Sequence, residues 1–353
     1  MKVLHVIARM NVGGTARYVG DLVAAEPAGY ESLLATGFVQ GSEIEDDCVH
    51  GLPIVRIPSM GRSINPVADI RAYFELRKVI REYEPDVVHS HTFKAGLLAR
   101  LVPGTHKRVH TFHGHLFDDQ SFSGLAKFFI TAAERFNAKR TDVLISVGER
   151  VGKELRAAGV GVGKKWVSIA PGVTPLATVP YTGEFVVGWM ARVTSVKNPL
   201  LALDVARLLP DVKFVMAGGG DMAHEIPLIA PSNLSVIGWT DAAKFWSSVS
   251  VALSTSDNEG MPIALIEAQL AGIPVVATDV GSNSEVIVNT ETGFVVQKSA
   301  QALADAISTL AAHSQLRTAM GSAASERALR VFSPAQMIDS HAALYMALFR
   351  PAA

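Results

Sequence analysis

The chain alternates between short, almost wholly apolar runs and longer stretches in which apolar residues recur every three or four positions. Runs rich in Val, Ile and Leu are typical of buried parallel strands, and amphipathic stretches are typical of helices that cover a sheet. In the first half, the pattern predicts strands at residues 2–8, 31–38, 52–58, 85–91, 107–114 and 141–148, and helices at 15–26, 66–84, 94–102 and 124–140. This alternation predicts an α/β fold.

The pattern breaks once and then starts again. Residues 170–184, "APGVTPLATVPYTGE", contain three prolines and two glycines without periodicity, so they are the best linker candidate. Beyond them the pattern predicts strands at 185–191, 212–220, 234–239, 249–256 and 273–278, helices at 198–209 and 263–272, and a terminal helix at 333–349. A chain of 353 residues also exceeds one typical core. We therefore predict two doubly wound domains that face each other across a deep cleft.

Composition excludes several classes of protein. Apolar residues make up 49% and charged residues 18%, which is typical of a globular chain, and the net charge of −1 argues against a nucleic-acid partner. The single Cys48 excludes an internal disulfide and suits a reducing cytosol. No apolar run reaches the roughly 18 residues of a membrane-spanning helix, and the start "MKVLHVIARMNVGG" alternates like a strand. We expect a cytoplasmic protein.

The segment "STSDNEGMPIALIEAQLAGIPVVATDVGSNSEVI" (254–287) carries carboxylates in an apolar context. A strand that ends near Ser256 and a helix that begins at Pro262 place Glu259 in the connecting loop and Glu267 within the helix. Unpaired amides at a helix start favour an anion or a hydroxyl-rich ligand, and paired carboxylates accept from sugar or ribose hydroxyls. Alternatively Glu259 is a solvated loop charge. Glu267 has apolar helix neighbours and needs a partner or a function.

Two cations follow another predicted strand, in "MARVTSVKNP". Arg192 and Lys197 lie between the strand end and a helix, where a guanidinium and an ammonium together suit a diphosphate. As an isolated pair they would be read as solvated surface charges; the glutamate segment favours the diphosphate site. Gly13 and Gly14, after the first strand, let the backbone approach a ligand closely, although the spacing is not the dinucleotide fingerprint.

Histidines gather in the first half, in "VVHSHT" (His89, His91) and "VHTFHGH" (His110, His113, His115). The His-x-His spacing puts two imidazoles on one face of a strand, so a metal site has to be considered. Without a cysteine partner or a known metal-binding pattern, we favour core or cleft histidines and predict no metal. His113, at a strand end, is the best candidate to line the cleft.

Residues 123–140, "SGLAKFFITAAERFNAKR", combine three phenylalanines with four basic residues. Such a helix can lie on an anionic membrane surface. We favour the alternative, in which the apolar residues cover the sheet and the basic residues face solvent.

Taken together, these motifs resemble the family 4 retaining glycosyltransferases, whose GT-B fold consists of two Rossmann-like domains. The resemblance covers nearly the whole chain and includes "NVGGTARYV", "DVVHSHT", "HTFHGH", "ARVTSVKNP" and the 254–287 segment. It implies an acceptor-binding domain at 1–172, completed by the C-terminal helix 334–350 crossing back, a linker at 173–182, and a donor-binding domain at 183–333. "PGVTP", Met261 and "GSNSE" depart from the family pattern.

The resemblance also implies roles for single residues. Glu259 contacts hydroxyls of the donor sugar, Glu267 holds the ribose, and Glu285 steadies the site. Donor contacts also come from the backbone of Gly260, Met261, Pro262, Gly13 and Gly14. Arg192 and Lys197 neutralise the diphosphate, and His113 lies near the transferring carbon. We predict acceptor contacts from the cleft candidates Asn11, Arg62, Thr92 and Lys94.

These expectations describe a metal-independent hexosyltransferase that uses a nucleoside-diphosphate sugar, with UDP the commonest in the family, an unidentified acceptor and no cofactor. It would act in polysaccharide, glycolipid or glycosylated-metabolite biosynthesis, and the excess of 22 basic over 18 acidic residues in 1–180 suits a phosphorylated or lipid-linked acceptor at the inner membrane face. The rivals are an epimerase-like or phosphorylase-like GT-B enzyme and a non-catalytic sugar-nucleotide binder. A nicotinamide oxidoreductase is disfavoured by the absent fingerprint.

Overall fold

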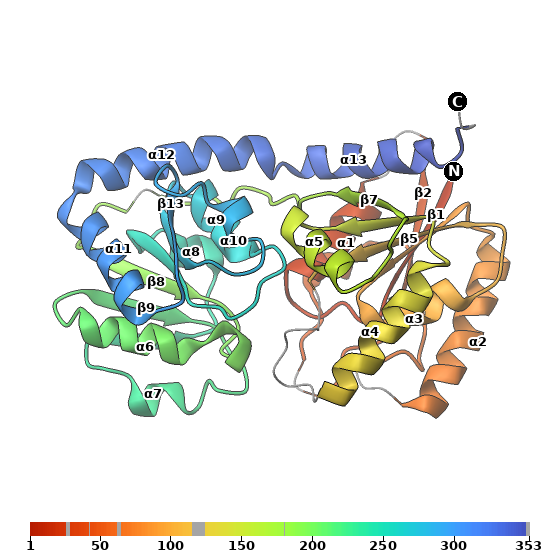
Figure 1. The fold of residues 1–353 in the computed structure, drawn as a ribbon, viewed down its shortest axis with the longest axis horizontal. Coiled ribbons are helices and arrows are strands. Elements are labelled where there is room, and N and C mark those ends of the chain that lie inside the picture. The colour runs from red at the N-terminus through yellow and green to blue at the C-terminus, as the bar shows by residue number, and fades with distance from the viewer. Residues whose placement is uncertain (26–28, 42, 62–64, 115–123, 180, 351–353) are drawn as a thin grey trace. The chain divides into compact units, whose positions relative to one another are not determined.

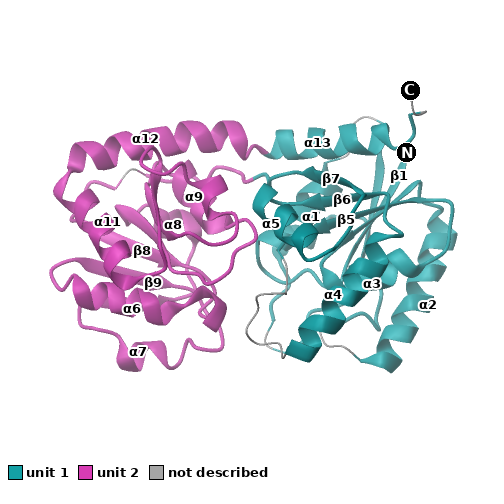
Figure 2. Cartoon of the chain, in the orientation of Figure 1, with its two compact units in different colours: residues 1–172, 334–353 teal, residues 173–333 magenta. Residues whose placement is uncertain are grey.

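The computed structural model describes residues 1–25, 29–41, 43–61, 65–114, 124–179 and 181–350. The chain forms two compact units, residues 1–172 with 334–353 (unit 1) and residues 173–333 (unit 2), coloured separately in Figure 2. Residues 173–182, which we predicted as a linker, fall in unit 2. Both units are α/β, as predicted (Figure 1).

Unit 1 is built on a parallel sheet with the strand order β3-β2-β1-β4-β5-β6-β7. The strands are β1 (Lys2–Ile7), β2 (Glu31–Thr36), β3 (Ile54–Arg56), β4 (Val87–His91), β5 (Lys107–Phe112), β6 (Val143–Ser146) and β7 (Lys165–Ser168). The order along the chain reverses between β1 and β4, which pair with Val3 opposite Val87. Ligands of doubly wound sheets bind beyond the carboxyl ends of the strands at such a reversal.

Helices cover both faces of this sheet. They are α1 (Gly14–Ala24), α2 (Pro66–Tyr83), α3 (Phe93–Leu101), α4 (Gly124–Ala138), α5 (Glu149–Ala157) and α13 (Pro334–Ala347), with a short 3-10 helix η1 (Asp47–Val49). The terminal helix α13 packs on α1, and the Tyr30 hydroxyl donates to the carbonyl of Ala342 at 2.7 Å. It lies where we predicted a helix at 334–350, and it ends three residues earlier. α3 lies between α2 and α4 (Figure 1).

Our prediction for α4 was wrong about which face is buried. Large apolar side chains point to solvent, with Phe128 64% and Phe129 61% exposed. The buried side carries Glu134, whose carboxylate accepts from Arg100 of α3 at 2.7 Å. Periodicity identifies residues that share a helix face, but the buried ion pair decides which face of α4 packs against the rest of unit 1.

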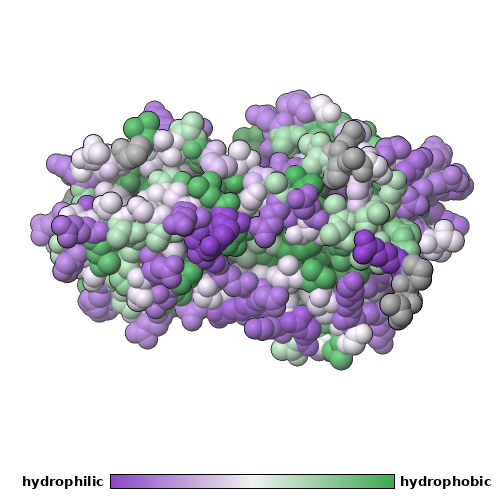
Figure 3. Space-filling model, turned by 90° about the horizontal axis from the view of Figure 1, so that it is seen from above, coloured by the Kyte–Doolittle hydropathy of each residue, from purple (hydrophilic) through white to green (hydrophobic). Residues whose placement is uncertain are grey.

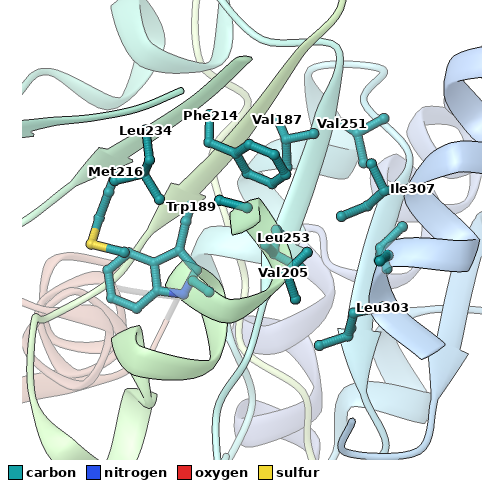
Figure 4. Packing of buried hydrophobic residues seen from close by; sticks show 14 of the residues in the cluster. Val187, Trp189, Val205, Phe214, Met216, Leu234, Val251, Leu253, Leu303 and Ile307 are labelled. Atoms are coloured by element: carbon teal, nitrogen blue, oxygen red, sulfur yellow. The ribbon is translucent and has the colours of Figure 1, made fainter. Parts of the chain in front are cut away.

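Unit 2 repeats the architecture with the strand order β10-β9-β8-β11-β12-β13, again all parallel. Its strands are β8 (Val186–Met190), β9 (Lys213–Ala217), β10 (Leu234–Gly238), β11 (Val251–Ser254), β12 (Val275–Thr278) and β13 (Gly293–Val296). The reversal now lies between β8 and β11. Figure 4 shows the core on one face, where Trp189 and Phe214 from the strands meet Ile307 from a covering helix.

Two helices of unit 2 lie where the pattern predicted them, α6 (Pro199–Leu208) and α9 (Ile263–Leu270). The other helices of this unit were not predicted. They are η2 (Ser195–Lys197), α7 (Ile226–Ile229), α8 (Ala242–Trp246), α10 (Asn283–Val286), α11 (Ala300–Ala312) and α12 (Ser314–Val331). Asn198 caps α6, because its side chain accepts from the backbone N–H of Leu201 at 3.1 Å.

Candidate functional site

The reversal between β8 and β11 brings two loops of unit 2 together. The loop after β8 carries Arg192 and Lys197, and the loop after β11 carries Glu259. The Lys197 ammonium lies 2.6 Å from Oε1 of Glu259, although 62 residues separate them in sequence. The structure thus joins one of the two predicted cations to the first predicted carboxylate. The Arg192 side chain is exposed in the same loop, five positions before Lys197.

Backbone and side-chain hydrogen bonds lock these two loops to each other. The amide of Asp257 donates to the carbonyl of Val196 at 2.8 Å. The hydroxyl of Thr255 donates to the carbonyl of Asn198 at 2.8 Å and accepts from the indole N–H of Trp189 at 2.9 Å. The ion pair therefore rests on a braced backbone, which reduces the entropy lost when a ligand binds.

The carboxylate of Glu259 is buried, with 8% of the residue exposed. Both of its hydrogen bonds use Oε1, from Lys197 at 2.6 Å and from the hydroxyl of Ser256 at 2.7 Å. Among the described residues, Oε2 has no hydrogen bond and can accept from a ligand hydroxyl. We did not select Ser256 from the sequence, although it lies only three residues before Glu259.

A second polar link lies beside the ion pair. The Asn198 amide donates to Oδ1 of Asp257 at 3.0 Å, and the ammonium of Lys298 lies 3.2 Å from the same oxygen. The sequence carried no signal for this link, because Lys298 lies 100 residues after Asn198, beyond the end of β13.

The helix after Glu259 begins at Ile263, the first residue of the stretch predicted at 263–272. Pro262 is the N-cap and α9 starts at Ile263, so Gly260 and Met261 form the half-buried connection just before the helix. Glu267 is buried within α9, with 7% of the residue exposed. A carboxylate in that position is costly without polar or charged surroundings.

The segment after β12 packs directly against Glu259. Gly281 has φ +46°, and a Cβ added there would lie 1.8 Å from the carbonyl oxygen of Glu259. Neighbouring polar atoms, Oγ of Ser282 and Oδ1 of Asn283, are buried without a hydrogen-bond partner among the described residues. Glu285 follows in α10, and its carbonyl accepts from Arg327 at 2.7 Å. Gly281 is thus a site residue that we did not predict.

The predicted residues of unit 1 also lie at the carboxyl ends of strands beside a reversal. Gly13 caps α1 with φ 148°, and a Cβ there would meet only open space. Asn11 and Gly14 are half-buried around it. Thr92, which follows β4, has φ 64° and ψ 162°, and its hydroxyl finds no hydrogen-bond partner within the described chain. A strained non-glycine backbone with an unpaired hydroxyl is typical of a functional position.

Two further acceptor candidates are placed differently. The ammonium of Lys94 is buried and lies 2.6 Å from Oδ1 of Asp69 in α2, so its charge is balanced inside unit 1. Arg62 and His115 lie outside the described residues.

A chain of imidazoles leads from the half-buried His113 into the core of unit 1. Nε2 of His113 lies 3.1 Å from Nδ1 of His91, and Nε2 of His91 lies 3.3 Å from Nδ1 of His5. As predicted from the His-x-His spacing, His89 and His91 share a face, with ring centroids 4.1 Å apart. Each neutral imidazole has one N–H, so the proton position on His113 is linked to that on its buried neighbours.

Helix α13 completes this cluster with residues that sequence reasoning did not select. Nδ1 of His341 donates to the carbonyl of Met337 at 2.8 Å, so its Nε2 accepts from the Tyr18 hydroxyl at 3.0 Å. The Tyr345 hydroxyl lies 2.5 Å from Nδ1 of His89. His341 and Tyr345 stand four positions apart, which indicates one helix face, but nothing local indicates that this face meets β4.

Burial keeps the cluster neutral. It lowers the pKa of His5 and His113 to about 3 and that of His341 to about 4. Nitrogens of His5, His89 and His91 lie within 4.8 Å of one another, so these three residues could hold a metal ion. Both nitrogens of His89 already have polar partners, Tyr345 and the hydroxyl of Thr111. Our prediction of no metal stays a prediction.

Comparison with known families identifies the class of protein. The glycosyl transferases group 1 model matches residues 177–327, and the glycosyl transferase 4-like domain model matches residues 13–172. The two models together span most of both units, so the chain belongs to the family 4 glycosyltransferases with the GT-B fold.

Two similar proteins are named as glycosyltransferases, one of them as putative. The chain is 26% identical over 272 residues to the Escherichia coli UDP-Gal:α-D-GlcNAc-diphosphoundecaprenol α-1,3-galactosyltransferase, covering 68% of this chain and 70% of that protein. It is 26% identical over 314 residues to the putative glycosyltransferase EpsD of Bacillus subtilis, covering 79% and 81%. The chain is therefore an enzyme, a glycosyltransferase that uses nucleotide sugars.

Solved structures show the same fold. Sucrose-phosphate synthase from Thermosynechococcus elongatus superimposes with a TM-score of 0.85 at 20% identity, covering 99% of both chains. Anabaena HepE, solved with UDP and glucose, gives 0.82 at 18% identity, covering 98% of this chain and 100% of that one. Within the described residues, no helix combines the length and apolar character that crossing a bilayer requires.

Proposed function

We propose that the chain is a retaining, metal-independent glycosyltransferase that moves a hexose from a UDP-sugar to an acceptor hydroxyl. The 2.6 Å contact between Lys197 and Glu259, at the strand reversal of unit 2, carries this proposal. It puts a cation for phosphate and an acceptor for sugar hydroxyls within one hydrogen bond of each other. The galactosyltransferase relative, whose name specifies a UDP-Gal donor, supports the choice of base and hexose.

In this proposal the cations stabilise the leaving group. The bond from the anomeric carbon to the β-phosphate oxygen breaks, and negative charge grows on the diphosphate. Lys197 has three N–H donors, so it can keep Glu259 and still donate to a phosphate, while the exposed Arg192 adds a second charge. Such preorganised donors contribute a few kcal/mol each, about 3 for one donor.

The carboxylates would hold the donor in place. Oε2 of Glu259 accepts from a sugar hydroxyl, Glu267 accepts from the ribose, and the backbone of Gly260, Met261 and Pro262 lines the phosphate side. Glu285, which is tied to Arg327 through its carbonyl, steadies this edge. The acceptor attacks the face from which the diphosphate leaves, and a phosphate oxygen takes its proton. Retention is inferred from the family resemblance.

Unit 1 would present the acceptor. Thr92 offers an unpaired hydroxyl and Asn11 a half-buried amide. The roles of His113 near the transferring carbon and of Gly13 and Gly14 at the donor phosphate follow from the family resemblance. The diphosphoundecaprenol acceptor named for the E. coli relative favours a lipid-linked sugar as the acceptor. Lys94 is already paired with Asp69 and therefore acts indirectly, by holding α3 to α2.

The test is a screen of nucleotide sugars by thermal shift, followed by turnover with lipid-linked acceptors. A donor at a hundred times its Kd should stabilise the protein by about 2.7 kcal/mol. The product's anomeric configuration, read by NMR, tests retention, and unchanged turnover in EDTA tests metal independence. Release of nucleotide and free sugar without an acceptor would favour an epimerase-like enzyme. Binding without any release of UDP would favour a non-catalytic binder.

A further inference from the structure

Helix α4 of unit 1 displays an apolar stripe to solvent. Its large exposed side chains are Leu125 (68%), Phe128 (64%), Phe129 (61%) and Phe136 (48%). At 100° per residue these positions fall within an arc of about 100°, so they form one continuous stripe along the helix. The exposed Ala132 lies within the same arc.

The opposite side of α4 is fixed by polar contacts. Its buried residues are Ile130, Glu134, Asn137 and Ala138. The carboxylate of Glu134 accepts from Nη2 of Arg100 at 2.7 Å, and both side chains are at most 5% exposed. Turning the helix to bury its phenylalanines would break this pair and leave Arg100 uncompensated. The outward display of aromatic side chains is therefore built into the packing of unit 1.

The charges beside the stripe have one sign. Arg135, Lys139 and Arg140 are exposed and Lys127 is half-buried, while Glu134 is the only acidic residue in 124–141. The guanidinium of Arg140 lies 3.8 Å from the centroid of the Phe136 ring, so one cation is held directly at the edge of the stripe.

We propose that this face of α4, the apolar stripe with its cations, docks on an anionic lipid bilayer. A helix of 15 residues is about 22 Å long and can lie in the plane of the interface. Phenylalanine rings then enter the boundary between headgroups and acyl chains, and the cations bind lipid phosphates. Docking of α4 on a bilayer does not depend on the proposed function. Only the idea that docking brings the enzyme to a lipid-linked acceptor rests on that function.

A second copy of the chain fits this face less well than a bilayer. A two-fold contact between two α4 faces would bring Arg135, Lys139 and Arg140 of both copies together without an intervening carboxylate. Unit 1 also exposes a shorter apolar group on α2, formed by Val67, Ile70 and Phe74. On the face that carries α12 and α13, Figure 3 shows hydrophilic residues spread between hydrophobic areas. Scattered apolar residues of that kind are normal on a soluble surface.

The test is flotation of the full chain with phosphatidylcholine vesicles, with and without phosphatidylglycerol. The double variant Phe128→Ser/Phe129→Ser should lose about tenfold or more of its vesicle affinity, because two large apolar groups are removed. Leu228→Ser/Ile229→Ser in unit 2 is the matched control: both residues are exposed, at 83% and 49%, but they lie close to the acidic Glu225. It should bind like the wild type.

Charge is tested separately with Lys139→Glu/Arg140→Glu. This variant should lose binding only to phosphatidylglycerol vesicles, by about fivefold or more per cation, and raised salt should mimic it. Equal binding of the wild type and the Phe128→Ser/Phe129→Ser variant would overturn the proposal. So would a wild-type dimer that this variant converts to monomer with vesicle binding unchanged. The thermal shift with nucleotide sugar should be the same in all variants, so failure here is distinct from failure of the proposed function.

Discussion

The ammonium of Lys197 lies 2.6 Å from the carboxylate of Glu259, at the point where the strand order of unit 2 reverses. Neither residue is held by this contact alone, because Thr255 ties its own loop to the carbonyl of Asn198. The pair therefore exists before any donor arrives, and under the proposed function a diphosphate bound by Lys197 would place its sugar beside Glu259.

Removing the cation tests this pair directly. We expect Lys197→Ala to lower turnover about 10²-fold, since one charge-stabilising donor is lost. It also leaves the buried Glu259 uncompensated, which should cost about 3 kcal/mol of unfolding free energy. Steady-state kinetics and urea denaturation measure both effects. Lys213→Ala, which removes the exposed partner of Glu184, is the control and should leave turnover unchanged. Full turnover in Lys197→Ala would refute the assigned role.

Gly281 offers a test of backbone packing at the site. A Cβ at this position would meet the carbonyl oxygen of Glu259 at 1.8 Å, so Gly281→Ala must shift the carboxylate. We expect a loss of about tenfold or more in kcat/KM, because small displacements of a positioning group are costly. Gly238→Ala is matched, since Gly238 also has positive φ (+71°) but open space around its Cβ. If Gly281→Ala and Gly238→Ala both lowered the stability but left kcat/KM unchanged, packing against Glu259 would not matter for activity.

The sequence was sufficient to predict the fold and half of this site. The strands predicted at 249–256 and 185–191 end at Ser254 and Met190 in the structure, so the loops that carry Glu259 and Lys197 could be located at strand ends. We predicted their meeting from the family resemblance and not from the pattern of the chain, because it depends on β8 and β11 being neighbours, which is a property of strand order. Gly281 was missed for the same reason, since its closeness to Glu259 depends on β12 lying beside β11.

The orientation of helix faces was the other feature that we could not predict from the sequence. The spacing of Phe128, Phe129 and Phe136 indicates one helix face, but the buried contact of Glu134 with Arg100 turns that face outward. Likewise His341 has no local feature that distinguishes it from a solvent-exposed histidine. Its role appears only when α13 packs on α1 and its imidazole accepts from Tyr18.

Thr92 tests whether backbone strain marks the acceptor site. Its φ of 64° and ψ of 162° lie in a region that glycine adopts freely, so Thr92→Gly should leave the unfolding free energy unchanged or raise it by up to about 1 kcal/mol. The same variant loses the unpaired hydroxyl, so KM for the acceptor should rise about tenfold while donor affinity holds. Thr92→Ser keeps the hydroxyl and should retain the KM. Thr290→Gly, at φ 68° in unit 2, controls for strain relief. An unchanged acceptor KM in Thr92→Gly would remove Thr92 from the acceptor site.

The imidazole cluster should make unit 1 sensitive to acid. Burial lowers the pKa of His5 and His113 to about 3 and that of His341 to about 4, and it also holds the pKa of His89 and His91 well below 6.5. Below pH 6.5 the unfolded chain binds protons that the native cluster excludes. The stability contributed by neutral imidazoles is therefore present above pH 6.5 and is lost as pH falls toward 4.

Each such histidine contributes a slope of up to about 1.4 kcal/mol per pH unit, so five together should destabilise the native state by several kcal/mol between pH 6.5 and 5.5. Burial raises the pKa of the Tyr18 and Tyr345 hydroxyls, which stay neutral throughout this range. Urea denaturation at a series of pH values measures the slope. His341→Gln should reduce it by about 1.4 kcal/mol per unit, because one proton fewer is excluded. His313→Gln, which replaces an exposed histidine of unit 2, should not change it. A stability that is flat from pH 7.5 to 5 would mean that the cluster accepts protons in the folded protein, contrary to its burial.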